Sequence, residues 1–132
     1  MNTDAYLRIQ YRDKARSETE GDCWQLVWLI YRDELGIRLP THSTVSLHTT
    51  DIDQLSEYID TGLADDFEPV EAVQPYDLIV LYQGKHPTHI ACAVDENEMI
   101  HLSEGRNFAI EPIFGKRWGN RIYRIYRHKA RL

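Results

Sequence analysis

The chain has 132 residues, the size of a single domain, and its 42% hydrophobic and 27% charged residues exclude a disordered tail. No apolar run approaches the roughly 18 residues that a membrane-spanning helix needs, and the N-terminus lacks the charged-then-apolar order of a signal peptide. The net charge of −6 disfavours nucleic acid as a partner, because acidic side chains repel phosphate. Two cysteines are too few for a disulfide framework. We therefore expect a single domain over residues 1–132, stabilised by its core.

The first clear element is a helix that begins after Asp22 and stops at Gly36. Asp22 is a good N-cap, and Gln25 three residues later completes the D-x-x-Q pattern of a capping box. Gly36 supplies the C-terminal stop. Apolar residues cover most of the circumference, which predicts a central buried helix: Trp24, Val27, Trp28, Ile30, Tyr31 and Leu35.

After this helix the pattern changes from loop to strands. Residues 37–50 contain Pro40 and several Ser and Thr, which predict a loop, and residues 51–60 predict a short helix that ends at Gly62. From Pro75 onward, apolar residues recur with a period of two. Strands are predicted at residues 77–82, 88–94, 98–102 and, with a helix as the alternative, 121–127. A helix followed by successive strands indicates an α+β fold.

Cys23 directly follows the N-cap and occupies the first turn of the predicted helix. Unpaired backbone N–H groups and the helix dipole favour a thiolate there, which predicts a lowered pKa and a nucleophilic cysteine. A small residue that merely packs at a helix end fits the same position.

His89 and His101 differ from the other four histidines because each lies within a predicted apolar strand, where an imidazole needs a partner. If residues 95–97 form a three-residue hairpin loop, His101 lies opposite Ala91, and His89 is its diagonal neighbour on the same face. Such a pair can supply the base and its orienting partner in a Cys-His-X triad. Two unrelated polar residues on a solvated face are the alternative.

Cys92 and the histidines could also serve other roles. Cys92 lies three residues past His89, so we expect it on the opposite strand face as an inert buried cysteine. A zinc site from His86, His89, His101 and a cysteine is an alternative, but the chain has no C-x-x-C or H-E-x-x-H spacing. We expect neither a metal nor an organic cofactor.

The C-terminal segment, residues 112–132, carries seven Lys and Arg and no acidic residue, whereas residues 1–111 carry eight against 21 Asp and Glu. Interleaved aromatic residues make a cationic and aromatic surface that suits docking onto an acidic partner or an anionic glycan. Alternatively, the segment is the closing strand and its arginines pair with the acidic body.

Three motifs carry a family resemblance. D-C-W-Q-L-V opens the predicted helix, T-H-I-A-C begins the strand at residues 88–94, and M-I-H-L lies in the next strand. Together they resemble the NlpC/P60 superfamily of papain-like cysteine peptidases, which mostly act on bacterial cell-wall peptides. The resemblance runs from about Tyr11 to about Ser103. It implies a papain-like fold, with the central helix packed on an antiparallel sheet.

The resemblance also implies a reaction. The chain would be a cysteine endopeptidase for peptidoglycan stem peptides that cleaves the D-glutamyl–diaminopimelate bond, with Cys23 as nucleophile, His89 as base and His101 as the residue that orients His89. Tyr11 lies where the family has a tyrosine 12 residues before the cysteine. Its hydroxyl and the Cys23 backbone N–H would stabilise the oxyanion. Asp22 would meet a free amino group of the stem peptide.

Trp24 and Gln25 replace the Ser-Gly that usually follows the family's nucleophile, so substrate contacts through that serine are not expected. This departure leaves the peptidoglycan specificity open, with Trp24 as the candidate substrate-binding residue at this position. D-C-W is similar to the version found in tail-assembly proteins of siphophage-like tails, and so is the closing run from HLSEGRNFAIEPIFGKRW to RIYRIYRH. This similarity implies phage tail proteins as partners and a location in the bacterial cytoplasm during assembly, then in the virion tail. A structural tail component with little activity and a related thiol acyltransferase or amidase are the alternatives.

Overall fold

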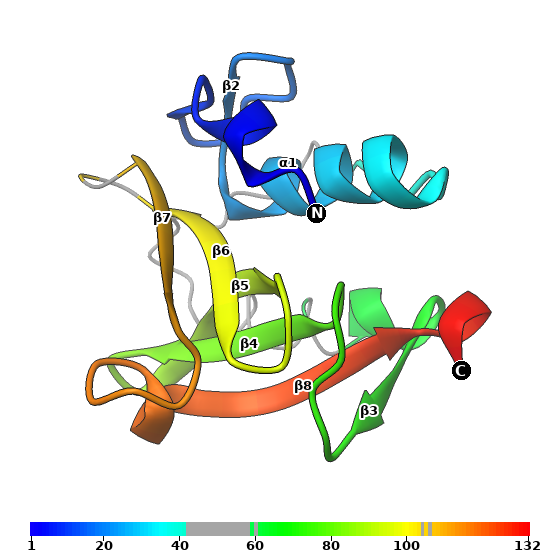
Figure 1. Cartoon of the computed structure of the whole chain (residues 1–132), viewed down its shortest axis with the longest axis vertical. Coiled ribbons are helices and arrows are strands. Elements are labelled where there is room, and N and C mark those ends of the chain that lie inside the picture. Colours follow the sequence, from blue (N-terminus) through cyan, green and yellow to red (C-terminus); the bar gives the residue numbers. More distant parts are fainter. Residues whose placement is uncertain (42–58, 60, 104, 106) are drawn as a thin grey trace.

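A curved antiparallel sheet with a helix on one side makes up the described part of the chain (Figure 1). The computed structural model describes residues 1–41, 59, 61–103, 105 and 107–132. Six strands follow the order β3-β8-β4-β5-β6-β7, and each neighbouring pair is antiparallel. The bounds are β3 (Phe67–Val70), β4 (Leu78–Gln83), β5 (His86–Ala93), β6 (Glu98–Ser103), β7 (Asn107–Pro112) and β8 (Ile122–His128). The predicted α+β fold is confirmed.

Two short strands lead the chain into the helix. β1 (Gln10–Tyr11) and β2 (Glu20–Gly21) pair in parallel, and α1 (Cys23–Ile30) begins two residues after β2. Oδ1 of Asp22 accepts a hydrogen bond from the Gln25 backbone N–H at 3.0 Å, as the N-cap prediction requires. Among the described residues, the Gln25 side chain donates to the Ser17 carbonyl at 2.9 Å, so only one half of the predicted capping box forms.

The helical segment continues past α1 through one π-helical turn, Tyr31–Leu35, and ends at Gly36. Gly36 has a φ of 66°, a left-handed conformation that glycine adopts without a Cβ penalty. The predicted stop is therefore confirmed. Every α1 residue except Trp28 is buried, which agrees with a central helix. No helix in the described ranges is long and apolar enough to cross a membrane.

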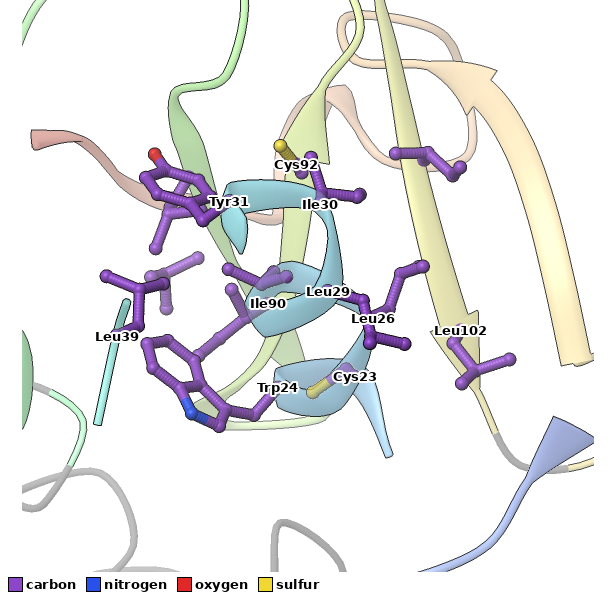
Figure 2. Close-up of a cluster of buried hydrophobic side chains, with 14 of the residues drawn as sticks. Cys23, Trp24, Leu26, Leu29, Ile30, Tyr31, Leu39, Ile90, Cys92 and Leu102 are labelled. Atoms are coloured by element: carbon purple, nitrogen blue, oxygen red, sulfur yellow. The ribbon is translucent and has the colours of Figure 1, made fainter. Parts of the chain in front are cut away.

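Both faces of the sheet are buried, and alternate residues of each strand point to opposite faces. One face packs on α1 through Leu78, Val80, Ile90, Cys92, Ile100 and Leu102. Figure 2 shows Ile90 and Leu102 beside the helix. The segment after β7 covers the opposite face with Ile113 and Trp118. Each buried aliphatic side chain contributes roughly 1.5–3 kcal/mol before entropy is counted. Both cysteines are free, so this burial stabilises the fold without a disulfide.

The four predicted strands are present, with ends shifted by one or two residues. Residues 121–127, for which a helix was the alternative, correspond to β8. The patterns do not predict β3 and β7, which are the two edge strands and contain Pro69 and Pro112. Proline has no backbone N–H to donate to a neighbouring strand and is found largely in edge strands. Because a proline counts against a strand prediction, these two strands were missed.

The region between α1 and β3 is described in part. Residues 37–41 have no regular structure, as predicted, and residues 42–50 lie outside the described residues. The predicted helix 51–60 also lies outside them, except for Ile59, which is helical. Residues 61–64 are helical as well, so Gly62 does not end the helix where the sequence predicted.

The basic C-terminal segment contributes an interior strand, because β8 lies between β3 and β4. Arg127 on β8 makes two hydrogen bonds to the carboxylate of Asp77, at 2.8 and 3.0 Å, and donates a third to the Ala72 carbonyl. The closing-strand interpretation is therefore confirmed for this part of the segment. The exposed basic side chains are those of Lys116, Arg117, Arg121, Arg124, Lys129 and Arg131.

Candidate active site

The two strand histidines meet on the sheet face opposite α1. Cys92 pairs with Ile100 and Ala93 with Met99, which is the register that a three-residue loop at 95–97 predicts. Nε2 of His89 lies 2.9 Å from Nδ1 of His101, within hydrogen-bond distance. Both rings are buried, with 3% of His89 and none of His101 exposed. The alternative of two unrelated residues on a solvated face is therefore excluded.

A carboxylate from β7 extends this pair. Oε2 of Glu111 lies 2.6 Å from Nε2 of His101 and also accepts a hydrogen bond from the Trp118 indole at 2.8 Å. Its other oxygen, Oε1, accepts a hydrogen bond from Arg117 at 2.7 Å. Burial raises the pKa of Glu111, but hydrogen bonds from Trp118 and His101 and the charge of Arg117 outweigh it and leave the pKa lowered. Glu111 is therefore an ionised acceptor at neutral pH.

Trp118 also packs directly against both imidazoles. Its ring stacks on His89, with centroids 5.8 Å apart and an interplanar angle of 21°. It meets His101 edge-on, with centroids 5.4 Å apart. These contacts and the indole hydrogen bond hold the His89–His101–Glu111 array in one arrangement.

His89 is neutral at physiological pH. Its pKa is lowered to about 3, mainly by burial and also by the adjacent His101, while the Glu111 carboxylate opposes this change in part. A neutral imidazole has one nitrogen that can accept a proton, which a general base requires. Nε2 faces His101, so Nδ1 is the nitrogen that remains for a nucleophile.

Cys23 occupies the first turn of α1, as predicted, but its thiol is buried, with 4% of the residue exposed. The pKa of the thiol is raised to about 12, mainly by burial and also by the Asp22 carboxylate, while the backbone N–H of Ile90 opposes this rise. The predicted lowering of the pKa by the helix N-terminus is therefore wrong for the resting protein. Desolvation of a thiolate outweighs the partial charge of a short helix.

The thiol lies near the strand that carries His89, because the Ile90 backbone N–H hydrogen-bonds to it. Within the described residues, no hydrogen bond joins Cys23 to His89 itself. In enzymes without substrate, catalytic hydrogen bonds are often long and tighten only when substrate binds. The array of Cys23, His89 and His101 as a working triad therefore stays a prediction.

Asp22 is fully buried beside the nucleophile position. Its Oδ1 accepts hydrogen bonds from the Gln25 backbone and from Arg16, whose Nη1 lies 2.8 Å away. Its Oδ2 is also buried and has no hydrogen-bond partner among the described residues. Asp22 therefore caps the helix with one oxygen and keeps a second acceptor next to Cys23.

Trp24 is a core residue. It is 3% exposed, and its indole donates to the Pro40 carbonyl at 2.8 Å, while Trp28 donates to the Leu39 carbonyl at 2.8 Å. The two indoles fasten residues 37–41 to α1, a role that the sequence patterns did not indicate. This burial argues against the predicted substrate contact through Trp24.

Tyr11, the predicted oxyanion donor, lies on β1 and pairs with Gly21, two residues before Cys23. It is half-buried and packs against the core that contains α1. Its place in the fold is near the start of α1, and its catalytic role stays a prediction.

Cys92 is fully buried on the face that packs against α1, as predicted, and burial raises the pKa of its thiol. Figure 2 shows Cys92 near the end of α1 away from Cys23. We expect Cys92→Ala to retain turnover within about twofold and to lower the free energy of unfolding by about 1 kcal/mol, because only one sulfur atom leaves the core. Activity assays and thermal melts test this. A folded but inactive variant would identify Cys92 as the nucleophile.

Sequence reasoning missed Glu111 and Trp118. His101 pairs with Ala109, so Glu111 is its diagonal neighbour on the same face of the sheet. The same rule that joined His89 to His101 would have found Glu111 if β7 had been predicted. In the described ranges, no group of three or more His, Cys, Asp or Glu side chains could hold a metal ion.

Comparison with known proteins gives a consistent result. A family model described as the NlpC/P60 family matches residues 8–127. A crystal structure of a protein similar to a lipoprotein of the NLP/P60 family, from Staphylococcus aureus subsp. aureus Mu50, shares the fold with a TM-score of 0.63 and 20% sequence identity. The match covers 95% of this chain and 38% of that chain. No curated protein sequence gives a significant match.

Proposed function

Because the chain belongs to the NlpC/P60 family, whose members are generally cysteine peptidases, we propose that it hydrolyses peptide bonds of bacterial cell-wall peptides with Cys23 as nucleophile. The observation that carries this proposal is the buried, hydrogen-bonded His89–His101 pair beside the strand backbone that contacts the Cys23 thiol. A buried pair of imidazoles is costly unless it is partnered, and the base and orienter of a triad have this arrangement.

In the proposed reaction the Cys23 thiol gives its proton to Nδ1 of His89 as the sulfur attacks the peptide carbonyl carbon. The C–N bond breaks when His89 returns the proton to the leaving amine, which leaves a thioester on Cys23. Water, deprotonated by His89, then hydrolyses the thioester and restores the thiol. His101 holds the His89 ring in place throughout.

Two further roles complete the proposed site. The Cys23 backbone N–H and the Tyr11 hydroxyl stabilise the oxyanion, a proposal supported by the position of β1 next to the strand that leads into α1. Oδ2 of Asp22 receives the free amino group of the stem peptide. The burial of this oxygen without a partner in the described residues supports that role.

The finer part of the proposal is that the substrate is the D-glutamyl–diaminopimelate bond. Digestion of purified muropeptides, followed by mass spectrometry, tests it. We expect two products, one ending in D-glutamate and one beginning with diaminopimelate. Cleavage at another bond would keep the peptidase and change its specificity, whereas intact muropeptides after prolonged incubation with folded protein would contradict the proposed activity.

His101 variants should give a graded loss of turnover. We expect His101→Ala to lower kcat by about 100-fold, and His101→Asn or His101→Gln by about tenfold, since an amide can still hydrogen-bond to His89. Steady-state kinetics with a soluble muropeptide and thermal melts measure the two effects separately. Equal losses of thermal stability and activity in all three variants would instead indicate a structural cluster.

A structural domain with little activity is the second candidate function. The raised thiol pKa and the absence of a Cys23–His89 hydrogen bond among the described residues favour it. We propose an association with phage tails for either function, supported by the D-C-W motif and the closing run that contains Trp118. Immunodetection of the chain in purified tail particles tests this association. Particles that lack the chain while the producing cells contain it would contradict the proposal.

A further inference from the structure

The hydrogen bonds of the histidine array have a direction that the carboxylate sets. An ionised carboxylate can only accept, so Nε2 of His101 carries the proton in its 2.6 Å contact with Glu111. If His101 is neutral, its Nδ1 is then an acceptor, and Nε2 of His89, 2.9 Å away, must be the donor. Neutral His89 with a proton on Nε2 has its lone pair on Nδ1.

We propose that Glu111 is a positioning residue that fixes the tautomers of His101 and His89, and so leaves Nδ1 of His89 as the proton acceptor for Cys23. This inference rests on the proposed peptidase function for its effect on turnover. The proton positions themselves are argued from the hydrogen bonds that join His89, His101 and Glu111 and do not require a substrate.

The opposite direction of these hydrogen bonds shows why residue 111 must be an acceptor. A donor in place of Glu111 would leave the proton of His101 on Nδ1 and make Nε2 of His89 the acceptor. His89 would then carry its proton on Nδ1, the nitrogen assigned to Cys23, and could not serve as its base. Glu111, which is connected to His89 through His101, therefore decides whether His89 can take the thiol proton.

Trp118 makes this arrangement specific. Its indole N–H, a donor only, binds the same Oε2 of Glu111 that accepts the hydrogen bond from Nε2 of His101. In Glu111→Gln, the N–H groups of His101 and Trp118 both need an acceptor, so the amide oxygen must occupy the position of Oε2. The amide nitrogen then faces Arg117, whose side chain is 39% exposed and can move away. Glutamine should therefore keep the tautomers and lose only the negative charge.

The charge has a separate effect. When His89 accepts a proton, its imidazole becomes positively charged in a buried environment, and the Glu111 carboxylate lowers the cost of that charge. Glu111→Gln loses this effect alone, whereas Glu111→Ala loses both the charge and the tautomer control. We expect turnover to fall by about tenfold in the first variant and by about 100-fold in the second.

The tautomers can be read directly from nitrogen chemical shifts of ¹⁵N-histidine-labelled protein at neutral pH, without any substrate. In the parent protein we expect protonated Nε2 and unprotonated Nδ1 on both His89 and His101. Glu111→Gln should retain this pattern, and Glu111→Ala should give a mixture. Glu98→Gln, which removes the same charge from an exposed position on the adjacent strand β6, is the matched control and should change neither the pattern nor turnover.

A parent protein with the His89 proton on Nδ1 would overturn the proposal, and so would an unchanged pattern in Glu111→Ala. If Glu111→Ala does not fold, the parent pattern and Glu111→Gln still decide the question. If the nitrogen shifts show the expected tautomers but neither the parent protein nor any variant cleaves muropeptides, Glu111 sets the tautomers and the peptidase function is rejected. If the protein cleaves muropeptides but its tautomers do not depend on Glu111, the peptidase function stands and the tautomer-setting role of Glu111 is rejected.

Discussion

Replacing Cys23 with alanine is expected to lower muropeptide cleavage by about 1,000-fold or more while the protein stays folded. The thiol sulfur is the atom that forms the bond to substrate in the proposed reaction, and alanine carries no nucleophile to replace it. The substitution removes one sulfur atom at the start of α1, so the free energy of unfolding should fall by about 1 kcal/mol. Mass spectrometry of digests and thermal melts measure the two effects.

Cys92→Ala is the matched control, because it removes the same atom from the same core cluster near the other end of α1. Loss of cleavage in Cys92→Ala and not in Cys23→Ala would reverse the choice of nucleophile. Full activity in both variants would show that neither thiol reacts, and would favour a structural role.

The thiol pKa changes how labelling experiments should be interpreted. With a pKa raised to about 12 by burial and by Asp22, the resting Cys23 holds almost no thiolate at neutral pH. Slow labelling by iodoacetamide would therefore not separate an enzyme from a structural domain. Trapping of the acyl-enzyme thioester on Cys23 with a slowly hydrolysed peptide ester is the sharper measurement.

The sequence predicted those parts of the site that depend on local periodicity. Alternation along two apolar strands and a three-residue turn were enough to place His89 against His101, because register is fixed wherever a strand face is buried. The N-cap at Asp22 and the stop at Gly36 follow from side-chain chemistry within one turn.

Long-range burial could not be predicted in this way. The pKa of Cys23 depends on how deeply the sheet covers the first turn of α1, and a helix position does not give this depth. Glu111 was missed because its strand is an edge strand that ends in Pro112. The apolar pattern of the helix predicted that Trp24 is buried, but not that its indole binds the carbonyl of Pro40, 16 residues away.

The largest expected loss of stability comes from Arg127. Its guanidinium binds both oxygens of Asp77, which is 1% exposed, and this ion pair ties β8 to the start of β4. Arg127→Gln would leave the Asp77 carboxylate buried without its partner, so we expect the free energy of unfolding to fall by about 3 kcal/mol and Tm to fall by about 10 °C. Thermal and denaturant melts measure this loss.

The matched control is Lys129→Gln, which removes the same charge from an exposed side chain next to β8 and should change the free energy of unfolding by less than about 0.5 kcal/mol. Asp77→Asn in the Arg127→Gln background should restore part of the loss, because it removes the unpaired charge. If Arg127→Gln and Lys129→Gln are both as stable as the parent protein, the ion pair contributes little to stability and the docking interpretation of the segment gains support. A loss of retention on intact sacculi in Lys129→Gln, with normal stability and normal cleavage of small muropeptides, would show that the exposed basic side chains bind the cell wall while Arg127 stabilises the fold.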